Sequence, residues 1–240
     1  MDKLYDFELI KITNETEDIK SYHFKYIGEG EFMWKAGQYL DWQFPHENAD
    51  DRGQRRWFSI SSSPSEGEIV LSCRFSEDGS TLKQQIVNLK VGDKVQAKGP
   101  FGEFTLPEVN KPTILIAGGI GITPFISILK QLESDGKLNN VQLLYGNRSA
   151  DNVPFKHELD QLASDSGGFK VDYVYSPDRI DAELAEDLCD GLEGKQFMIS
   201  GLEKMVISIE ESLISAGVAK KDIRIDDFGG YDYHLEKPIF

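Results

Sequence analysis

The spacing of apolar residues changes once along this chain of 240 residues, and that change constrains the fold more than any other feature. Up to about residue 105, apolar side chains alternate with polar ones, as in the segments 19–26, 39–44 and 68–75. A period of two is typical of antiparallel strands with one buried face. Turn sequences rich in glycine separate these segments. We therefore expect the first part of the chain to form a small antiparallel β-barrel.

The second part of the chain has continuous apolar runs instead of alternation. Segments with helical spacing lie between these runs, around residues 124–133, 155–163 and 203–216. Unbroken apolar strands that alternate with helices are typical of a parallel sheet covered on both faces. The predicted fold is therefore an antiparallel β-barrel, in a domain of residues 1–108, followed by a doubly wound α/β parallel sheet, in a domain of residues 112–240. The expected parallel strands are 113–117, 141–145, 169–175, 196–199 and 223–225.

Composition excludes several classes of function. The formal net charge is −15, which argues against nucleic acid or an anionic membrane as the main partner. The longest apolar run, residues 114–129, is interrupted by three glycines and a proline, so we expect no membrane insertion. The first ten residues show no signal-peptide pattern, which predicts a cytoplasmic location. The two cysteines, Cys73 and Cys189, are too few for a four-thiolate cluster, and no metal site is predicted.

A glycine-rich segment follows directly on the first apolar run of the second part. Gly118, Gly119 and Gly121 let the backbone turn tightly and approach a phosphate. Thr123 adds a hydroxyl, and Pro124 suits the first turn of a helix whose free N–H groups attract an anion. Pro124 stands where the dinucleotide fingerprint has its third glycine, so this is a different motif. We favour phosphate binding; the alternative is a tight turn in which the glycines only serve packing.

A second segment combines an arginine, aromatic rings and a hydroxyl. Arg56, Trp57, Phe58 and Ser59 follow one another, and alternation places Arg56 and Phe58 on the same face of a strand. Arginine can hold a pyrophosphate through two hydrogen bonds. Phe58 can stack on a planar ring system, and Ser59 can donate to a ring nitrogen. Taken alone, the segment is also compatible with a core strand that carries a surface arginine.

The order of these segments is typical of one family. Arg56-x-Phe58-Ser59, the sequence Gly-Pro-Phe-Gly-Glu-Phe at 99–104, and the glycine-rich segment at 118–124 occur in that order. With them, the chain resembles the ferredoxin–NADP reductase family of flavoproteins over roughly residues 5–231. The resemblance implies a barrel that binds FAD, rather than FMN, and a second domain that binds NADPH or NADH. It implies a reductase that passes hydride from the nicotinamide nucleotide to the bound flavin.

The resemblance also implies roles for individual residues in flavin binding. Arg56 would meet the flavin pyrophosphate, Phe58 would stack on the isoalloxazine ring, and Ser59 would lie near its reactive nitrogen. Arg74 and Phe75 resemble the second flavin strand of the family. The phosphate loop of the family is matched by Gly79, Ser80 and Thr81. For Gly79 the alternative is a simple hairpin turn.

Further residues are assigned to the nicotinamide nucleotide. By resemblance, residues 118–124 hold its pyrophosphate, and Ser200 with Gly201 begins the last nucleotide loop. Ser200 stands where many members have a cysteine near the nicotinamide, so Ser59 and Ser200 are the candidate catalytic side chains. Phe228 or Tyr231 resembles the aromatic residue that the family places beside the flavin.

The choice between NADH and NADPH stays open at this point. The second parallel strand is followed by Asn147 and Arg148, without the acid that commonly holds the 2′-hydroxyl of NAD. Arg148 is suited to a 2′-phosphate and favours NADPH, while Asp151 nearby weakens that preference. We expect Arg179 to flank the adenosine.

The resemblance implies an electron-acceptor protein without identifying it. Ferredoxins, flavodoxins, haem proteins and oxygenase components all serve the family. A net charge of −15 disfavours an acidic ferredoxin unless a basic patch receives it. Two alternatives are kept: a flavin reductase that uses free FMN or FAD as a substrate, since no adenine-stacking aromatic is evident near Gly79, and a nucleotide-sensing module without enzymatic activity.

Overall fold

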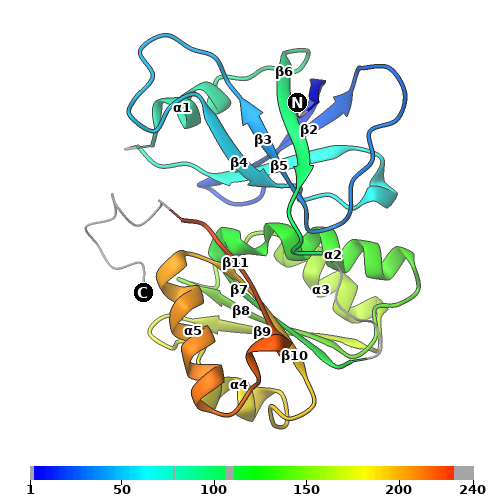
Figure 1. Cartoon of the computed structure of the whole chain (residues 1–240), viewed down its shortest axis with the longest axis vertical. Helices are drawn as coiled ribbons and strands as arrows, with labels where there is room; N and C mark the ends of the chain where they lie inside the picture. The colour runs from blue at the N-terminus through cyan, green and yellow to red at the C-terminus, as the bar shows by residue number, and fades with distance from the viewer. Residues whose placement is uncertain (1–2, 78, 106–110, 230–240) are drawn as a thin grey trace.

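The computed structural model describes residues 3–77, 79–105 and 111–229 and has two parts stacked along its long axis. An antiparallel sheet forms one part, and a parallel sheet covered by helices forms the other (Figure 1). The predicted fold class is therefore confirmed. The predicted boundary between residues 108 and 112 falls largely on residues 106–110, outside the described residues, and stays a prediction.

The N-terminal part is a six-stranded antiparallel sheet with the order β4-β3-β6-β1-β2-β5. A bridge between Ile60 and Leu71 brings the end of β4 to β5, so the sheet curls into a half-barrel. The short helix α1 (Thr81–Val87) buries Leu82 and Ile86 at one opening. The strands are β1 (Leu4–Asn14), β2 (Ile19–Tyr26), β3 (Tyr39–Gln43), β4 (Arg55–Ser59), β5 (Ile69–Arg74) and β6 (Lys94–Phe101).

The alternating residues of this sheet form its core, as the period of two predicts. Leu40 and Trp42 of β3 are buried, and the Trp42 ring packs 4.7 Å from that of Phe24. Strands β1 and β6 were not expected from the sequence. In β1, a bulge between Leu9 and Lys11 shifts the register and interrupts the alternation, which hides the strand from pattern reading.

The C-terminal part is a five-stranded parallel sheet with the order β11-β10-β7-β8-β9. Helices α2 and α3 cover one face, and α4 and α5 cover the other. The strands are β7 (Thr113–Gly118), β8 (Val141–Asn147), β9 (Phe169–Tyr175), β10 (Gln196–Gly201) and β11 (Ile223–Asp227). The helices are α2 (Thr123–Ser134), α3 (Lys156–Asp165), α4 (Ala182–Leu188) and α5 (Glu203–Ser215), with single turns at η1 (Pro64–Glu66), η2 (Gly119–Ile122) and η3 (Lys220–Asp222).

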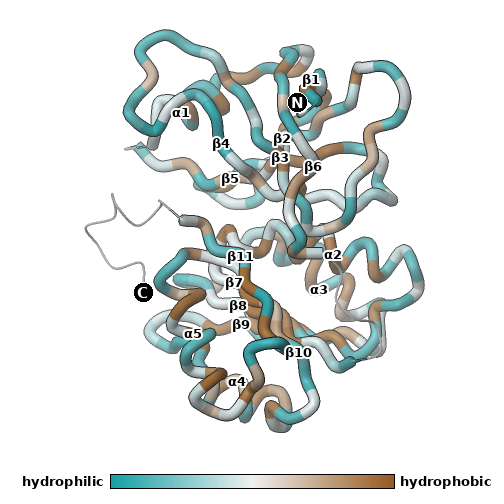
Figure 2. Tube along the Cα trace, viewed as in Figure 1, coloured by the Kyte–Doolittle hydropathy of each residue, from teal (hydrophilic) through white to brown (hydrophobic). Residues whose placement is uncertain are grey.

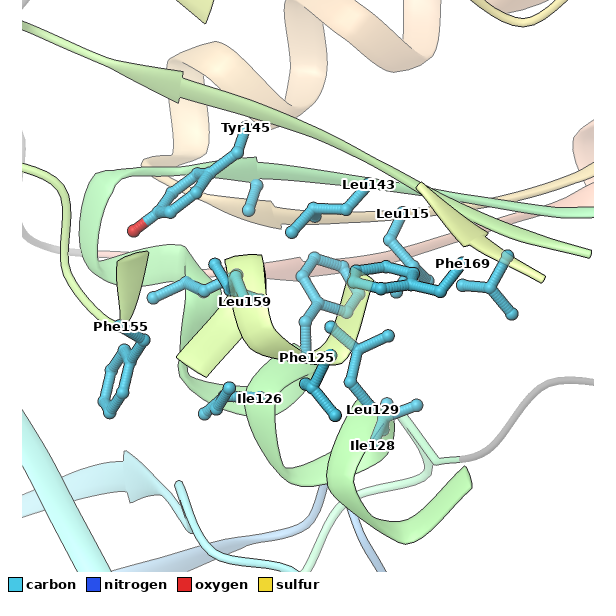
Figure 3. Packing of buried hydrophobic residues seen from close by; sticks show 14 of the residues in the cluster. Leu115, Phe125, Ile126, Ile128, Leu129, Leu143, Tyr145, Phe155, Leu159 and Phe169 are labelled. Atoms are coloured by element: carbon cyan, nitrogen blue, oxygen red, sulfur yellow. The ribbon is translucent and has the colours of Figure 1, made fainter. Parts of the chain in front are cut away.

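The central strands β7 and β10 are buried at every residue because both of their faces are covered, whereas the edge strands β9 and β11 also carry charged residues. The sheet forms the hydrophobic centre of the C-terminal part in Figure 2. Figure 3 shows the cluster between the sheet and helices α2 and α3, where Phe125 and Leu129 lie below Leu115 and Leu143. Helix α4 was not expected from the sequence, because its buried positions are alanines, which give little periodic signal.

No helix within the described ranges has the length and apolar character needed to cross a membrane. The two parts of the fold contact each other directly through α2, which lies below the half-barrel in Figure 1. The Ser127 hydroxyl donates to the carbonyl oxygen of Ser62 over 2.6 Å, and Lys130 lies 3.0 Å from the carboxylate of Glu66. These contacts set strands β4 and β5 opposite the carboxyl ends of the parallel strands.

Candidate active site

A crevice of about 540 Å³ lies between the half-barrel and the parallel sheet. The first group of lining residues comes from the half-barrel: Tyr39, Asp41, Arg55, Arg56, Trp57, Phe58, Ser59, Ser72, Cys73 and Arg74. The second group comes from the α/β part: Ile120, Thr123, Asp226, Asp227, Phe228 and Gly229. The sequence reasoning expected two of these segments, 56–59 and the glycine-rich turn, to face each other, and the crevice brings them together.

Strand β4 contributes all five of its residues to the crevice. Strict alternation would give the crevice only every second residue, but β4 is an edge strand whose outer side is uncovered. Phe58 is half-buried and packs against the half-barrel core. Trp57 is 69% exposed, and its ring lies 5.5 Å from that of Tyr39. Two flat aromatic surfaces therefore border the crevice on this side.

Three arginines line the crevice, although the chain as a whole is strongly acidic. Arg55 is paired with the carboxylate of Asp41. Arg56 donates from Nη2 to the carbonyl oxygen of Arg52 over 3.2 Å. Guanidinium groups are suited to bidentate contact with phosphate oxygens. The lining also includes three aspartates, Asp41, Asp226 and Asp227, so its charges are mixed, and Arg56 and Arg74 are the arginines that can meet a pyrophosphate.

The glycine-rich turn after β7 is fixed by a hydrogen bond from β8 and packs closely against the end of β10. Gly119 has a φ of +52°, and its carbonyl oxygen accepts a hydrogen bond of 2.8 Å from the buried hydroxyl of Tyr145. Figure 3 shows this hydroxyl pointing toward the turn. A β-carbon on Gly121 would lie 2.7 Å from the Cα atom of Gly201. Gly118 and Gly121 thus serve packing, while the Thr123 hydroxyl donates to the carbonyl oxygen of Ile120 over 3.1 Å.

Arg74 reaches from the half-barrel to this turn. A β-carbon placed on Gly119 would lie 3.5 Å from Nη2 of Arg74 and 3.7 Å from Nη1. On the other side, Nε of Arg74 lies 3.1 Å from the carboxylate of Asp18. The guanidinium group therefore faces the glycine turn of the α/β part, although the sequence assigned Arg74 to the flavin.

The ends of β10 and β11 close the crevice. The main-chain N–H of Phe228 donates to the carbonyl oxygen of Gly201 over 3.0 Å, which fixes the half-buried Phe228 at the crevice wall. The hydroxyl of Ser200, which is fully buried, donates to Asp226 over 3.3 Å. Tyr231, the other candidate aromatic, lies outside the described residues.

Sequence reasoning missed Asp226. Burial raises the pKa of its carboxyl to about 6; the Ser200 hydroxyl acts in the opposite direction, and Asp227 adds to the rise. Asp226 can therefore hold or release a proton near neutral pH. One sequence signal was available: Asp226 precedes the candidate aromatic Phe228 by only two residues, and both line the crevice.

Several predicted residues lie outside the crevice lining. Ser80 caps α1 by accepting from the N–H of Lys83, and the N–H of Thr81 donates to Asp50, whose carboxylate occupies the start of this helix. Phe75 packs with Tyr22, at a ring distance of 6.1 Å. The other predicted residues outside the lining are Gly79, Gly118, Gly119, Gly121, Pro124, Asn147, Arg148, Arg179, Ser200 and Gly201.

The residues predicted to recognise the adenosine lie at the carboxyl ends of β8 and β9. Asn147 is buried, and its side-chain amide donates to the carbonyl oxygen of Tyr145 over 3.4 Å. Arg148 and Arg179 are exposed. They stand at the edge of the sheet where parallel strands of this kind present ligand-binding loops.

Comparison with known proteins identifies both parts of the chain. Residues 6–106 match the family model of an oxidoreductase FAD-binding domain, and residues 115–211 match that of an oxidoreductase NAD-binding domain. The chain is 30% identical to a flavohemoprotein of Candida albicans, over 95% of this chain and 60% of the relative. It is 26% identical to the reductase component of a propane 2-monooxygenase of Mycolicibacterium goodii, over 91% and 56% of the two proteins.

A solved structure covers almost the same extent. The FAD/NAD-binding domain of a nitric oxide dioxygenase from Vibrio cholerae is 25% identical, with a TM-score of 0.79 over 95% of this chain and 99% of that one. The chain spans about 60% of the length of the flavohemoprotein. With its FAD-binding half-barrel and its NAD-binding parallel sheet, the chain belongs to the ferredoxin–NADP reductase-like family of oxidoreductases.

Proposed function

We propose that this chain is a reductase that accepts hydride from NADH or NADPH onto bound FAD and delivers electrons to a separate acceptor protein. The observation that carries the proposal is the shared crevice, to which the half-barrel contributes β4 and the parallel sheet contributes its glycine turn and the end of β11. Hydride transfer needs two ring systems in contact and away from water, and a crevice between two domains meets that need.

The residues of β4 fit the flavin. Arg56 would bind the pyrophosphate, since it lines the crevice and its guanidinium group can contact two phosphate oxygens at once. Phe58 would support one face of the ring, and the hydroxyl of Ser59 would donate to a ring nitrogen. Phe228 would cover the ring from the side of the α/β part. When bound, FAD supplies the redox chemistry; the protein positions it and excludes water.

The positions of Arg74 and Asp226 change the roles that we propose for the residues of the crevice. Arg74 faces Gly119, which favours a role in binding the pyrophosphate of the nicotinamide nucleotide rather than that of the flavin. Asp226 lines the crevice beside Ser200, and its raised pKa suits it to hold a proton next to the reacting rings. Ser200 would then act by orienting Asp226.

Purification and anaerobic titration test this function. The purified full chain is expected to be yellow, and NADH or NADPH added without oxygen should bleach the flavin absorbance near 450 nm within seconds, on the order of typical enzyme turnover. A colourless protein with no activity toward either nucleotide, with or without added flavin, would contradict the proposal and favour a nucleotide sensor.

One observation favours the alternative, a flavin reductase that uses free FMN or FAD. The N-terminus of α1, which the sequence assigned to the flavin phosphate, is occupied by the carboxylate of Asp50. Without that helix, the flavin would be held by fewer phosphate contacts. A colourless protein that oxidises NAD(P)H only when flavin is added, with a rate that saturates in flavin at micromolar concentration or above, would establish this alternative.

For the acceptor, we infer a haem protein or an oxygenase component on another domain or chain. The relatives named as a flavohemoprotein and as the reductase component of a monooxygenase support this inference. Reduction of a haem domain added in trans, followed by its absorbance, tests it. A reductase that reduces only small-molecule acceptors under all conditions would argue against a protein acceptor.

Arg148 is proposed to favour NADPH. It is exposed at the end of β8, where a 2′-phosphate can reach it. Arg148→Ala is expected to lower the ratio of kcat/KM for NADPH over NADH by about tenfold, because one charge-assisted contact is lost. The ratio is measured from initial rates with both nucleotides. An unchanged ratio would remove Arg148 from nucleotide recognition.

A further inference from the structure

Asp18 joins the two parts of the molecule beside the crevice. It stands in the turn between β1 and β2, and its carboxylate accepts hydrogen bonds from the Thr16 hydroxyl over 2.8 Å and from the side-chain amide of Asn152 over 3.1 Å. Asn152 belongs to the loop between β8 and α3 of the α/β part. The third contact of the carboxylate is with Nε of Arg74, at 3.1 Å. Asp18 therefore ties a half-barrel arginine and a loop of the nucleotide domain together.

The charge of Asp18 is maintained in this position. Burial would raise the pKa of its carboxyl, but Arg74 and the hydrogen bonds from Thr16 and Asn152 outweigh burial, and the pKa lies below its usual value. Asp18 is thus ionised over the whole neutral range, and its attraction for Arg74 does not vary there.

The contact with Asp18 determines which edge of the Arg74 guanidinium is available. A guanidinium group has donors at Nε and at both Nη atoms in one plane. Nε lies 3.1 Å from the Asp18 carboxylate as an ion pair without hydrogen-bond geometry, whereas Nη1 and Nη2 are the atoms that approach Gly119. The main chain of Arg74 is held as well, because its carbonyl oxygen accepts from Nζ of Lys83 over 2.6 Å. The attraction of Asp18 therefore acts on the Nε side of the guanidinium group, while both Nη atoms lie beside the glycine turn.

We propose that Asp18 is a positioning residue for the nicotinamide nucleotide: it orients Arg74 so that both Nη atoms face the pyrophosphate at the glycine turn, and through Asn152 it fixes the half-barrel to the nucleotide domain. This inference rests on the proposed function. It adds a residue that lies outside the crevice lining and acts through Arg74.

The sign of the effect separates this role from simple electrostatics. Removal of a carboxylate near a pyrophosphate site would, by charge alone, strengthen the binding of the nucleotide. If Asp18 orients Arg74, its removal weakens binding instead, because the arginine must be ordered at the moment of binding. An increase in the apparent Kd for the nucleotide is therefore a result that loss of charge cannot produce.

The experiment uses five variants of the full chain and anaerobic stopped-flow reduction of the bound flavin by NADH and by NADPH. Asp18→Asn is expected to raise the apparent Kd for the nucleotide by about fivefold to twentyfold, with little change in the limiting rate or in flavin content. Glu17→Gln removes the same charge from an exposed neighbour in the same turn and should leave all three quantities unchanged. Asp18→Glu, which retains the charge, should lie between wild type and Asp18→Asn.

The fourth comparison places Asp18→Asn on an Arg74→Ala background. If Asp18 acts through Arg74, the second substitution adds no further rise in the apparent Kd. An equal rise in both backgrounds, a lowered Kd in Asp18→Asn, or the same effect in Glu17→Gln would each overturn the proposal. Failure of the proposed function itself has a different signature, since wild type would then show no flavin reduction by either nucleotide.

Discussion

Arg56 uses little of its hydrogen-bonding capacity within the protein. Among the described residues its side chain donates from Nη2 to the carbonyl oxygen of Arg52, and the residue lines the crevice; a guanidinium group has five N–H donors. Such a residue contributes to binding more than to folding. Phe58 differs, because it also packs against the half-barrel core, so that its replacement would mix both effects.

Arg56→Ala is therefore expected to weaken FAD binding by about tenfold or more while leaving the thermal midpoint of the flavin-free protein nearly unchanged. Arg56→Lys keeps the charge but lacks the planar guanidinium group, so its affinity for FAD should lie between those of wild type and Arg56→Ala. Fluorescence titration with FAD measures the Kd, and a differential scan of the flavin-free protein measures stability. Equal affinity in all three proteins would remove Arg56 from flavin binding.

Asp226 gives a prediction about pH. Its pKa is raised to about 6 in the folded protein from an ordinary value of 3.8, so the folded state binds this proton more tightly than the unfolded state does. Stability contributed by the protonated carboxyl is therefore fully present below pH 4 and is lost as the pH rises through 6. Asp226→Asn cannot ionise and should exceed wild type in thermal midpoint by roughly 3 °C at pH 7.5, but not at pH 4.

Thermal scans of both proteins between pH 4 and pH 8 measure this difference. Asp187→Asn is the control, since Asp187 is exposed and has no part in the raised pKa of Asp226. A difference between Asp226→Asn and wild type that does not vary with pH would show that the carboxyl has an ordinary pKa.

At the scale of elements, the glycine turn between β7 and α2 depends on the end of β10. The turn lies against the main chain of Ser200 and Gly201, which leaves no room for a side chain at position 121. Tyr145 of β8 fixes the same turn through its hydroxyl. The conformation of the phosphate-binding segment is thus set by two neighbouring strands as well as by its own sequence.

Gly121→Ala is expected to lower the free energy of unfolding by about 1–3 kcal/mol, because the added methyl group overpacks a site bounded by backbone atoms. Gly167→Ala is the matched control: its β-carbon would meet nothing within 4 Å, and its effect should stay within about 0.5 kcal/mol. Urea denaturation of the two variants measures both values. Similar stabilities would mean that the turn can shift away from β10 at little cost.

At the scale of the whole molecule, the distribution of charge affects how an electron acceptor approaches the protein. The chain carries a net charge of −15, its crevice is lined by three arginines and three aspartates, and the phosphates of bound cofactors would add further negative charge there. The holoenzyme should therefore present a negative field to an approaching electron acceptor.

Two small one-electron acceptors of opposite charge test this field. Between about 20 and 200 mM salt, reduction of ferricyanide should become faster and reduction of hexaammineruthenium(III) slower, each by about twofold or more, because salt screens repulsion in the first case and attraction in the second. Steady-state rates with saturating NAD(P)H measure both. The same trend for the two acceptors would show that the surface field does not control their approach.

The sequence by itself determined the division into two sheets and the segments that meet at the crevice. Alternating apolar residues indicate a strand with one covered face, and a continuous apolar run indicates a strand with two covered faces. Both patterns can be recognised within a few neighbouring residues. The composition of residues 56–59 and of the glycine turn is equally local, so both were predicted from their sequence alone. The helix α4 and the bulged strand β1 were missed because small side chains and a shifted register erase the same periodic signal.

Only the tertiary structure decided which residues far apart in the sequence share a function. Asp226 obtains its raised pKa from burial beside Ser200, 26 residues away in the sequence, and the direction of Arg74 is set by Asp18 on a different strand connection. Asp50 fills the start of α1 from a distant loop. Burial and electrostatic interactions depend on distance in space, and a pattern along the chain does not report that distance.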